Sequence, residues 1–84
     1  MRIQIEVDES GARVLDEIKQ STGLSTYKEI FNNSITLLEW AVKQRIEGRT
    51  IASLDERSKN YKELQMPPLE AAARRAKQPA AAAR

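Results

Sequence analysis

The 84-residue chain contains no cysteine and no histidine. Their absence excludes disulfide bonds, thiolate chemistry and the commonest zinc ligands. Carboxylate pairs do not replace them, because the paired residues are adjacent in sequence and neighbours on a helix point about 100° apart. We therefore expect no enzyme activity, no metal ion and no cofactor.

Long hydrophobic runs are also missing. The sequence has no stretch of about 18 apolar residues and no apolar signal-peptide core, which predicts a cytoplasmic protein rather than a membrane-spanning or exported one. A chain this short seldom builds a core worth more than about 3–5 kcal/mol by itself. With disulfides and zinc excluded, association with a second chain is the remaining source of stability, so we expect a homo-oligomer.

Net positive charge is confined to the end of the sequence. Residues 1–66 hold ten lysines and arginines against eleven aspartates and glutamates, whereas residues 67–84 hold four against one. The body of the chain is therefore nearly neutral and cannot bind phosphates through bulk charge. Any contact with nucleic acid must come from a local surface.

Polar and apolar residues alternate in the opening segment, "MRIQIEVD". The apolar residues are Ile3, Ile5 and Val7, and the polar residues are Arg2, Gln4 and Glu6. Because successive side chains leave opposite faces of a strand, this pattern predicts a half-buried β-strand. No second strand is predicted in the first 48 residues, so the strand needs a partner from another chain.

A first helix is predicted at about residues 10–21. Asp8 or Ser10 can cap its start, and Gly23 can supply the left-handed residue that ends it. Apolar residues recur in this segment at helical spacing. This gives a helix of about three turns directly after the strand.

A second helix is predicted from "LSTYKEIF" to about residue 47. Thr26 and Glu29 have the spacing of a capping box, and Gly48 stops the helix. Its apolar residues form two adjoining stripes. A stripe this wide indicates burial on more than one side.

The C-terminal third gives weaker signals. Two short apolar runs, "TIASL" and "YKELQM", flank the polar stretch "DERSKN", which is compatible with a β-hairpin and equally with a turn followed by irregular chain. Two prolines follow, and "LEAAARRAKQ" is compatible with a short helix. We divide the chain into a region with the strand and the two helices at 1–48, an extension at 49–70 and a basic, alanine-rich tail at 71–84 that we expect to be disordered.

A strand followed by two helices predicts a mainly helical α+β fold. In the most economical arrangement, the strand pairs antiparallel with the same strand of a second chain, and the helices of both chains close over the apolar face of this two-stranded ribbon. The expected dimer core consists of Ile3, Ile5, Val7, Val14, Ile18, Ile30, Phe31, Ile35 and Leu38. The polar strand residues, contributed twice, would face outward.

The order and spacing of these segments resemble the ribbon-helix-helix family of DNA-binding repressors, most closely its Arc-type members, over roughly residues 2–49. The segment "YKEIFNNSI" is similar to the start of the family's second helix, and the motif that closes that helix recurs as Glu47, Gly48 and Arg49. The resemblance implies an intertwined homodimer whose ribbon enters the major groove of DNA. It leaves open whether dimers assemble further on DNA.

The family places base-contacting side chains on the polar face of the ribbon, which here means Arg2, Gln4 and Glu6. Arginine and glutamine suit the edges of guanine and adenine, and glutamate can accept from the cytosine amino group. In the family, the N-terminus of the second helix points at a DNA phosphate. The residues expected to bind phosphate there are Ser25, Thr26, Tyr27 and Lys28. The predicted function is a homodimeric, sequence-specific transcriptional repressor that binds double-stranded DNA.

An antitoxin-like or adaptor protein is the alternative function. The extension beyond residue 48 is longer than a minimal repressor needs, and it carries apolar side chains that need covering. These candidate partner-binding residues are Ile51, Leu54, Tyr61, Leu64 and Met66. The dimer itself, a neighbouring dimer on DNA, or another protein such as a toxin would cover them, and the sequence does not choose among the three.

Overall fold

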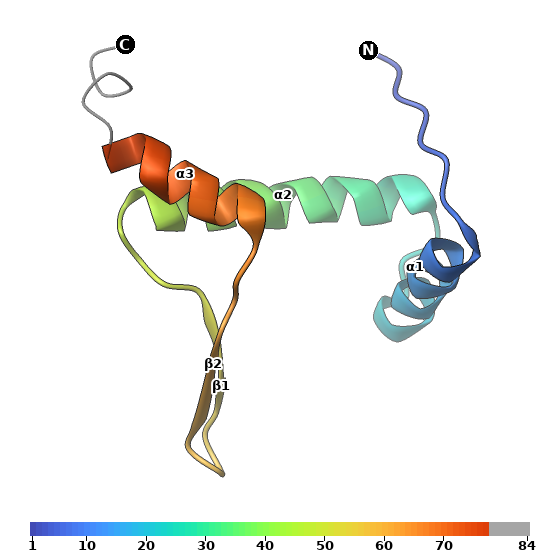
Figure 1. Cartoon of the computed structure of the whole chain (residues 1–84). Coiled ribbons are helices and arrows are strands. Elements are labelled where there is room, and N and C mark those ends of the chain that lie inside the picture. Colours follow the sequence, from blue (N-terminus) through green and yellow to red (C-terminus); the bar gives the residue numbers. More distant parts are fainter. Residues whose placement is uncertain (78–84) are drawn as a thin grey trace. The chain divides into compact units, whose positions relative to one another are not determined.

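A computed structural model describes residues 1–77 of the chain, which form two helices, a β-hairpin and a third helix (Figure 1). The helices are α1 (Glu9–Thr22), α2 (Tyr27–Ile46) and α3 (Pro67–Lys77), and the strands are β1 (Ala52–Asp55) and β2 (Asn60–Glu63). The chain divides into two compact units at residue 36, within α2.

The predicted fold is wrong in its first element. Residues 1–8 form no β-strand, and the sheet of the described residues is a hairpin within one chain. The protein therefore has two N-terminal helices, an intramolecular hairpin and a C-terminal helix, not a ribbon-helix-helix order with an intermolecular ribbon. The physical reason is pairing. The backbone N–H and C=O groups of a strand need hydrogen-bond partners. No strand of the described chain pairs with residues 1–8, whereas β1 and β2 are joined by a short loop and pair with each other.

Helix α1 begins and ends at the residues predicted to cap it. An Oδ1 of Asp8 accepts hydrogen bonds from the Gly11 N–H at 2.8 Å and the Ser10 hydroxyl at 3.0 Å. Asp8, rather than Ser10, is therefore the N-cap, and these hydrogen bonds lower the pKa of its carboxyl. At the other end Gly23 has a φ of 76°, which a residue with a Cβ adopts only at a cost, and its N–H donates to the Lys19 carbonyl.

Helix α2 begins with the predicted capping box. The Glu29 N–H donates to the Thr26 hydroxyl, and the Thr26 N–H donates to the Glu29 carboxylate, both at 3.1 Å. The same carboxylate oxygen accepts from the Ser25 hydroxyl at 2.7 Å, from the Ser25 N–H and from the Thr26 hydroxyl. These hydrogen bonds, the one from the Ser25 hydroxyl foremost, hold the pKa of Glu29 below its ordinary value of 4.5.

The first unit, residues 1–36, buries little apolar surface. Ile30 is 6% exposed, and no residue of α1 is buried. Tyr27 ties α2 to α1, because its hydroxyl donates to Asp16 at 2.8 Å and the Lys19 ammonium lies 4.5 Å from the centre of its ring. The helices are therefore joined by polar contacts more than by a core.

In the second unit, α3 packs against the C-terminal part of α2. Leu69 is fully buried and Ala41 is 5% exposed. An ion pair of 3.1 Å joins Arg45 on α2 to Glu70 on α3, with side chains 19% and 32% exposed. The short helix suggested by the sequence is confirmed, and residues 71–77 of the predicted tail belong to it. The rest of that tail, residues 78–84, lies outside the described residues.

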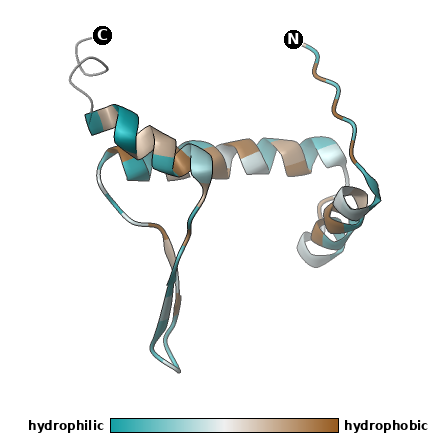
Figure 2. Cartoon of the chain, in the orientation of Figure 1, coloured by the Kyte–Doolittle hydropathy of each residue, from teal (hydrophilic) through white to brown (hydrophobic). Residues whose placement is uncertain are grey.

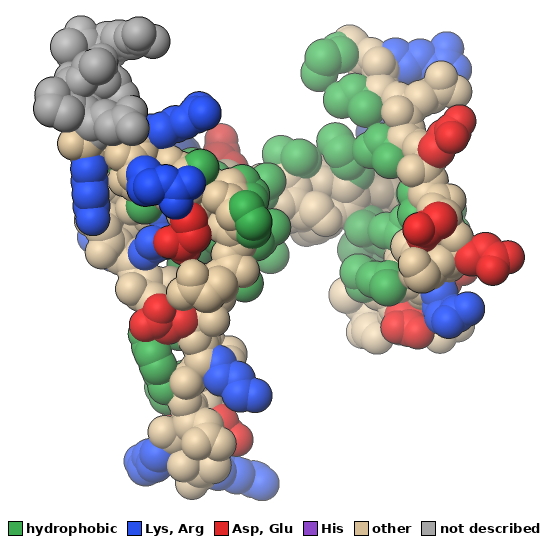
Figure 3. Space-filling model, in the orientation of Figure 1, with side chains coloured by type: hydrophobic (Ala, Val, Ile, Leu, Met, Phe, Trp, Pro, Cys, Tyr) green, Lys and Arg blue, Asp and Glu red, His purple; other side chains and the backbone are tan. Residues whose placement is uncertain are grey.

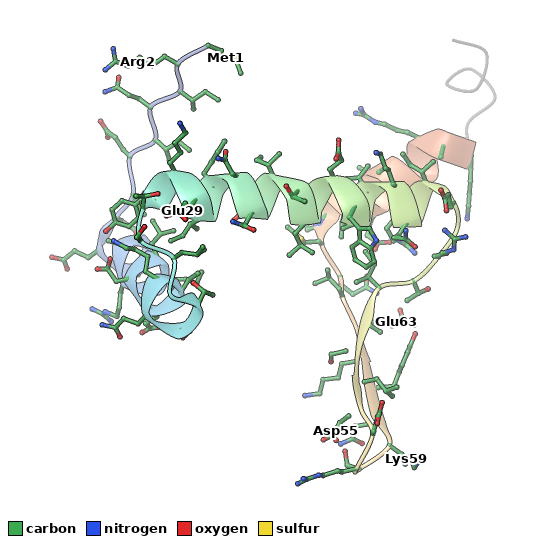
Figure 4. The ribbon with its side chains drawn as sticks, turned by 180° about the vertical axis from the view of Figure 1, so that it is seen from behind. Met1, Arg2, Glu29, Asp55, Lys59 and Glu63 are labelled. Carbon is green, nitrogen blue, oxygen red and sulfur yellow. The ribbon has the colours of Figure 1, made fainter. Side chains whose placement is uncertain are left out.

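The hairpin is the other element that the sequence left open. The antiparallel pairs are Ala52 with Glu63, Ser53 with Lys62, Leu54 with Tyr61, and Asp55 with Asn60. In the loop at 56–59, the Asp55 carboxylate accepts from the Arg57 N–H at 3.0 Å, and Lys59 adopts a left-handed φ of 62° (Figure 4). A local turn therefore closes the hairpin.

Replacing Glu29 by glutamine is expected to flatten the acid dependence of stability. The folded-state pKa of Glu29 lies below the ordinary value, so its carboxylate stabilises the fold above about pH 4.5, and this contribution is lost as the pH falls through the folded-state pKa. Thermal melts followed by circular dichroism between about pH 3 and pH 7 measure the effect. Glu39→Gln is the control, since Glu39 lies on the same helix but outside its capping box. Equal pH profiles for the two variants would contradict this role.

Glu70→Gln is expected to loosen α3. Loss of the partly buried charge from the Arg45 pair should cost about 1 kcal/mol, which is about fivefold faster amide exchange in α3. Hydrogen exchange followed by NMR measures this directly. Glu47→Gln is the control, because Glu47 pairs with Arg49 at an exposed site. If both variants left α3 exchange unchanged, the ion pair would contribute nothing to its docking.

Candidate nucleic-acid interface

The residues predicted to contact bases lie in the N-terminal segment, which we define as residues 1–8. Arg2, Gln4 and Glu6 are exposed there, and none of them forms a hydrogen bond or salt bridge with the rest of the described chain. Hydrophilic and hydrophobic residues alternate along this segment in Figure 2. Figure 4 shows Arg2 at its free end. The polar side chains are therefore available to a ligand, although no strand or helix holds them.

Val7 anchors the N-terminal segment to α1. A Cβ added at Gly11 would collide with Cγ1 of Val7, so the valine side chain fills the space that the glycine leaves. Beyond this contact the apolar side of the segment is open, with Ile3 55% and Ile5 66% exposed. The structure therefore fixes where the segment joins α1 and leaves the side chains of Ile3 and Ile5 largely uncovered by the described residues.

The residues predicted to bind phosphate do lie together at the N-terminus of α2, but most of their polar groups are occupied. The hydroxyls of Ser25 and Thr26 donate to Glu29. The Tyr27 hydroxyl donates to Asp16, which raises the pKa of the phenol. Lys28 is exposed and has no hydrogen bond or salt bridge to any residue within 1–77.

A phosphate at this helix end would meet the Glu29 carboxylate, which already accepts the hydrogen bonds that a phosphate needs (Figure 4). The capping-box spacing was the sequence signal for this competition, because that motif places a carboxylate over the first turn. The Lys28 ammonium is the predicted phosphate ligand that the structure leaves free. Ser25 and Thr26 become ligands only if Glu29 moves away.

The residues predicted to form a dimer core are largely uncovered in the single chain. Apart from Ile30, they are exposed: Ile3 55%, Ile5 66%, Val7 46%, Val14 52%, Ile18 38%, Phe31 39%, Ile35 50% and Leu38 36%. Scattered single apolar residues on a surface are normal, but a set this large exceeds what a small monomer usually exposes. The prediction that a second copy covers them stays open.

The candidate partner-binding residues lie on the hairpin and beside it. Leu54, Tyr61, Leu64 and Met66 are exposed and Ile51 is half-buried. The structure brings Leu54 and Tyr61 directly opposite each other across the two strands. This juxtaposition was not predicted. It depends on the register of the hairpin, and the sequence was equally compatible with a turn followed by irregular chain.

Within residues 1–77, no group of three or more aspartate, glutamate, histidine or cysteine side chains is placed to hold a metal ion. No helix of the described part is both long enough and apolar enough to cross a membrane. In comparisons with protein-family models, curated proteins and solved structures, nothing matches this chain.

Proposed function

We propose that this chain is a cytoplasmic, homodimeric DNA-binding protein that recognises a specific sequence and represses transcription. The observation that carries the proposal is the N-terminal segment, where free polar side chains alternate with uncovered apolar ones. A second copy that covers the apolar side chains would leave the polar ones free to contact DNA.

The chemistry of the polar side suits base edges. Arg2 can donate two hydrogen bonds to guanine, Gln4 can pair with adenine, and Glu6 can accept from cytosine. Because the body of the chain is nearly neutral, attraction to DNA in general should be weak. Binding would depend on these base contacts more than on counterion release.

Contact with the DNA backbone is proposed at Lys28. Its ammonium is free, whereas the hydroxyls of Ser25 and Thr26 are held by Glu29. A phosphate drawn in by Lys28 would compete with the Glu29 carboxylate for the first turn of α2, where the helix dipole favours an anion. Because of this competition, the contact with the DNA phosphate would be weaker than at a helix N-terminus without such a carboxylate.

The dimer is supported by the exposed apolar side chains. Of the nine residues predicted to form its core, all except Ile30 are 36% or more exposed in the described chain. A surface that exposes many apolar side chains is typical of a protein-protein interface. A second copy of the chain can therefore cover the apolar side chains of residues 3–38.

Ile5→Lys tests the dimer. A charge placed among apolar side chains that pack between two copies should weaken the dimer by at least about tenfold, because a buried unpaired charge is costly. Sedimentation equilibrium over a dilution series measures this. Gln4→Lys adds the same charge at the neighbouring polar position and should leave the mass unchanged. A wild-type monomer, or equal masses for both variants, would contradict the proposed dimer.

Gln4→Ala tests the base contact. A selection of genomic fragments at physiological salt should first enrich a palindromic or tandem motif, because non-specific binding weakens steeply with salt. Against that motif, Gln4→Ala should lose about 1–3 kcal/mol per contact, or roughly 5- to 150-fold in affinity. Gln20→Ala, which removes an exposed amide from α1, is the control. Failure to enrich any motif would remove the DNA-binding function.

A further inference from the structure

The C-terminal end of α3 carries a cluster of positive charge. Arg74, Arg75 and Lys77 lie in the last turn of the helix, and all three are exposed. We call these three residues the basic end of α3. Figure 3 shows lysine and arginine side chains gathered around this helix. Without the basic end, the formal net charge of the chain would be −1 instead of +2, so it is a local positive surface on an otherwise nearly neutral molecule.

Acidic residues of the described chain do not neutralise the basic end. Glu70 is the one acidic residue of α3, and its carboxylate pairs with Arg45 of α2 at 3.1 Å. Within residues 1–77, the side chains of the basic end form no salt bridge and no hydrogen bond. The helix dipole favours cations in a last turn, but it leaves their exposed charged groups unpaired. The positive charge is therefore available to an anion from outside the chain.

The positive charge also belongs to one unit of the chain. Residues 37–77 hold nine lysines and arginines against six aspartates and glutamates, whereas residues 1–36 hold four against six. The hairpin, from β1 to β2, contributes three residues of each sign. The excess therefore lies on the helices of the second unit, and an anion would be attracted to them rather than to the hairpin.

Helix α3 holds the basic end on a packed part of the molecule. Leu69 at the start of α3 is 1% exposed. The ion pair of Arg45 with Glu70 adds a second contact between α3 and α2. Because the helix is already formed and docked, a ligand would have to order only the side chains of the basic end, which lowers the entropic cost of binding.

The three charges cover more than one side of α3. Arg74 and Lys77 are three residues apart, so they are neighbours on one side of the helix. Arg75 points about 100° away from Arg74, and it lines an open groove beside Ile46 at the end of α2. One small anion could not contact all three side chains. A ligand with several phosphates in a row could.

The backbone of DNA suits this surface better than a membrane does. The guanidinium of arginine binds a phosphate through two parallel hydrogen bonds. A helix that binds a membrane inserts large apolar side chains among the lipids, and none of the exposed large apolar residues of the described chain belongs to α3. Contacts with DNA phosphates need no such insertion.

We propose that the basic end of α3 is a second DNA-contacting surface, which binds backbone phosphates whatever the base sequence. The proposal rests on the proposed function for the choice of DNA as ligand. It assigns a contact to residues other than those proposed at the bases and at the N-terminus of α2. Sequence-dependent contacts then come from residues 2–6, and a salt-dependent, sequence-independent contact comes from α3.

The triple substitution Arg74→Gln, Arg75→Gln and Lys77→Gln is expected to weaken binding to every DNA duplex. Each phosphate contact that is lost lowers the slope of log K against log salt by about 0.9, so three contacts should lower it by about 2.7. Fluorescence anisotropy of a labelled duplex between about 50 and 200 mM salt measures this slope. At the lowest salt, the affinity should fall at least about tenfold, and equally for motif DNA and for a scrambled duplex.

A matched control removes the three positive charges of the hairpin, through Arg57→Gln, Lys59→Gln and Lys62→Gln. Both triple variants change the net charge by the same amount within the same unit. The hairpin variant should keep the salt slope of the wild type. An unchanged slope in the α3 variant, or an equal fall in both variants, would overturn the proposal.

A charge-conserving variant separates charge from helix stability. Arg74→Lys with Arg75→Lys keeps all three positive charges, so the salt slope should stay within about one unit of the wild-type value. Circular dichroism shows whether each variant keeps its helices. If this variant lost as much of the slope as the glutamine variant, the positive charge would not be the cause and the proposal would be wrong.

The scrambled duplex also separates this proposal from the proposed function. If no motif is enriched but the α3 variant alone loses salt-dependent binding to the scrambled duplex, the phosphate contact stands and sequence recognition does not. If a motif is enriched and the α3 variant keeps the full salt slope, sequence recognition stands, and the basic end is left to another partner, such as an acidic protein segment.

Discussion

The shortage of buried apolar surface is the constraint on which the rest of this protein depends. Three hydrophobic residues are buried in the described chain, Ile30, Ala41 and Leu69. Because burial is the main favourable term in folding, so small a core contributes little stability to the single chain. The proposed dimer through residues 3–38 would supply the apolar contacts that the single chain lacks.

Local hydrogen bonds, rather than a core, define where the elements begin and end. Asp8 and Gly23 bound α1, the Thr26 and Glu29 box starts α2, and Asp55 holds the hairpin loop. These contacts span few residues, so they form without long-range packing. They explain how a chain with so small a core still has regular helices and a closed hairpin.

The same local chemistry shapes the candidate site. A carboxylate that caps α2 stabilises the helix but occupies the donors that a phosphate would use. The N-terminal segment, in contrast, makes few contacts and leaves Arg2, Gln4 and Glu6 free. Under the proposed function, helix capping and phosphate contact compete at the N-terminus of α2, and base contacts from residues 2–6 supply most of the specificity.

The amino-acid sequence by itself determined α1 and α2 and their capping residues, because capping residues act within one turn. It also determined that polar and apolar residues alternate in the N-terminal segment. It did not determine a strand there, because a strand forms only if another strand satisfies its backbone hydrogen bonds. The expected pairing with a strand of a second chain was wrong. Tertiary structure alone decided the hairpin register that brings Leu54 to Tyr61 and the ion pair of Arg45 with Glu70. Both join residues that the chain brings together only once it has folded back on itself.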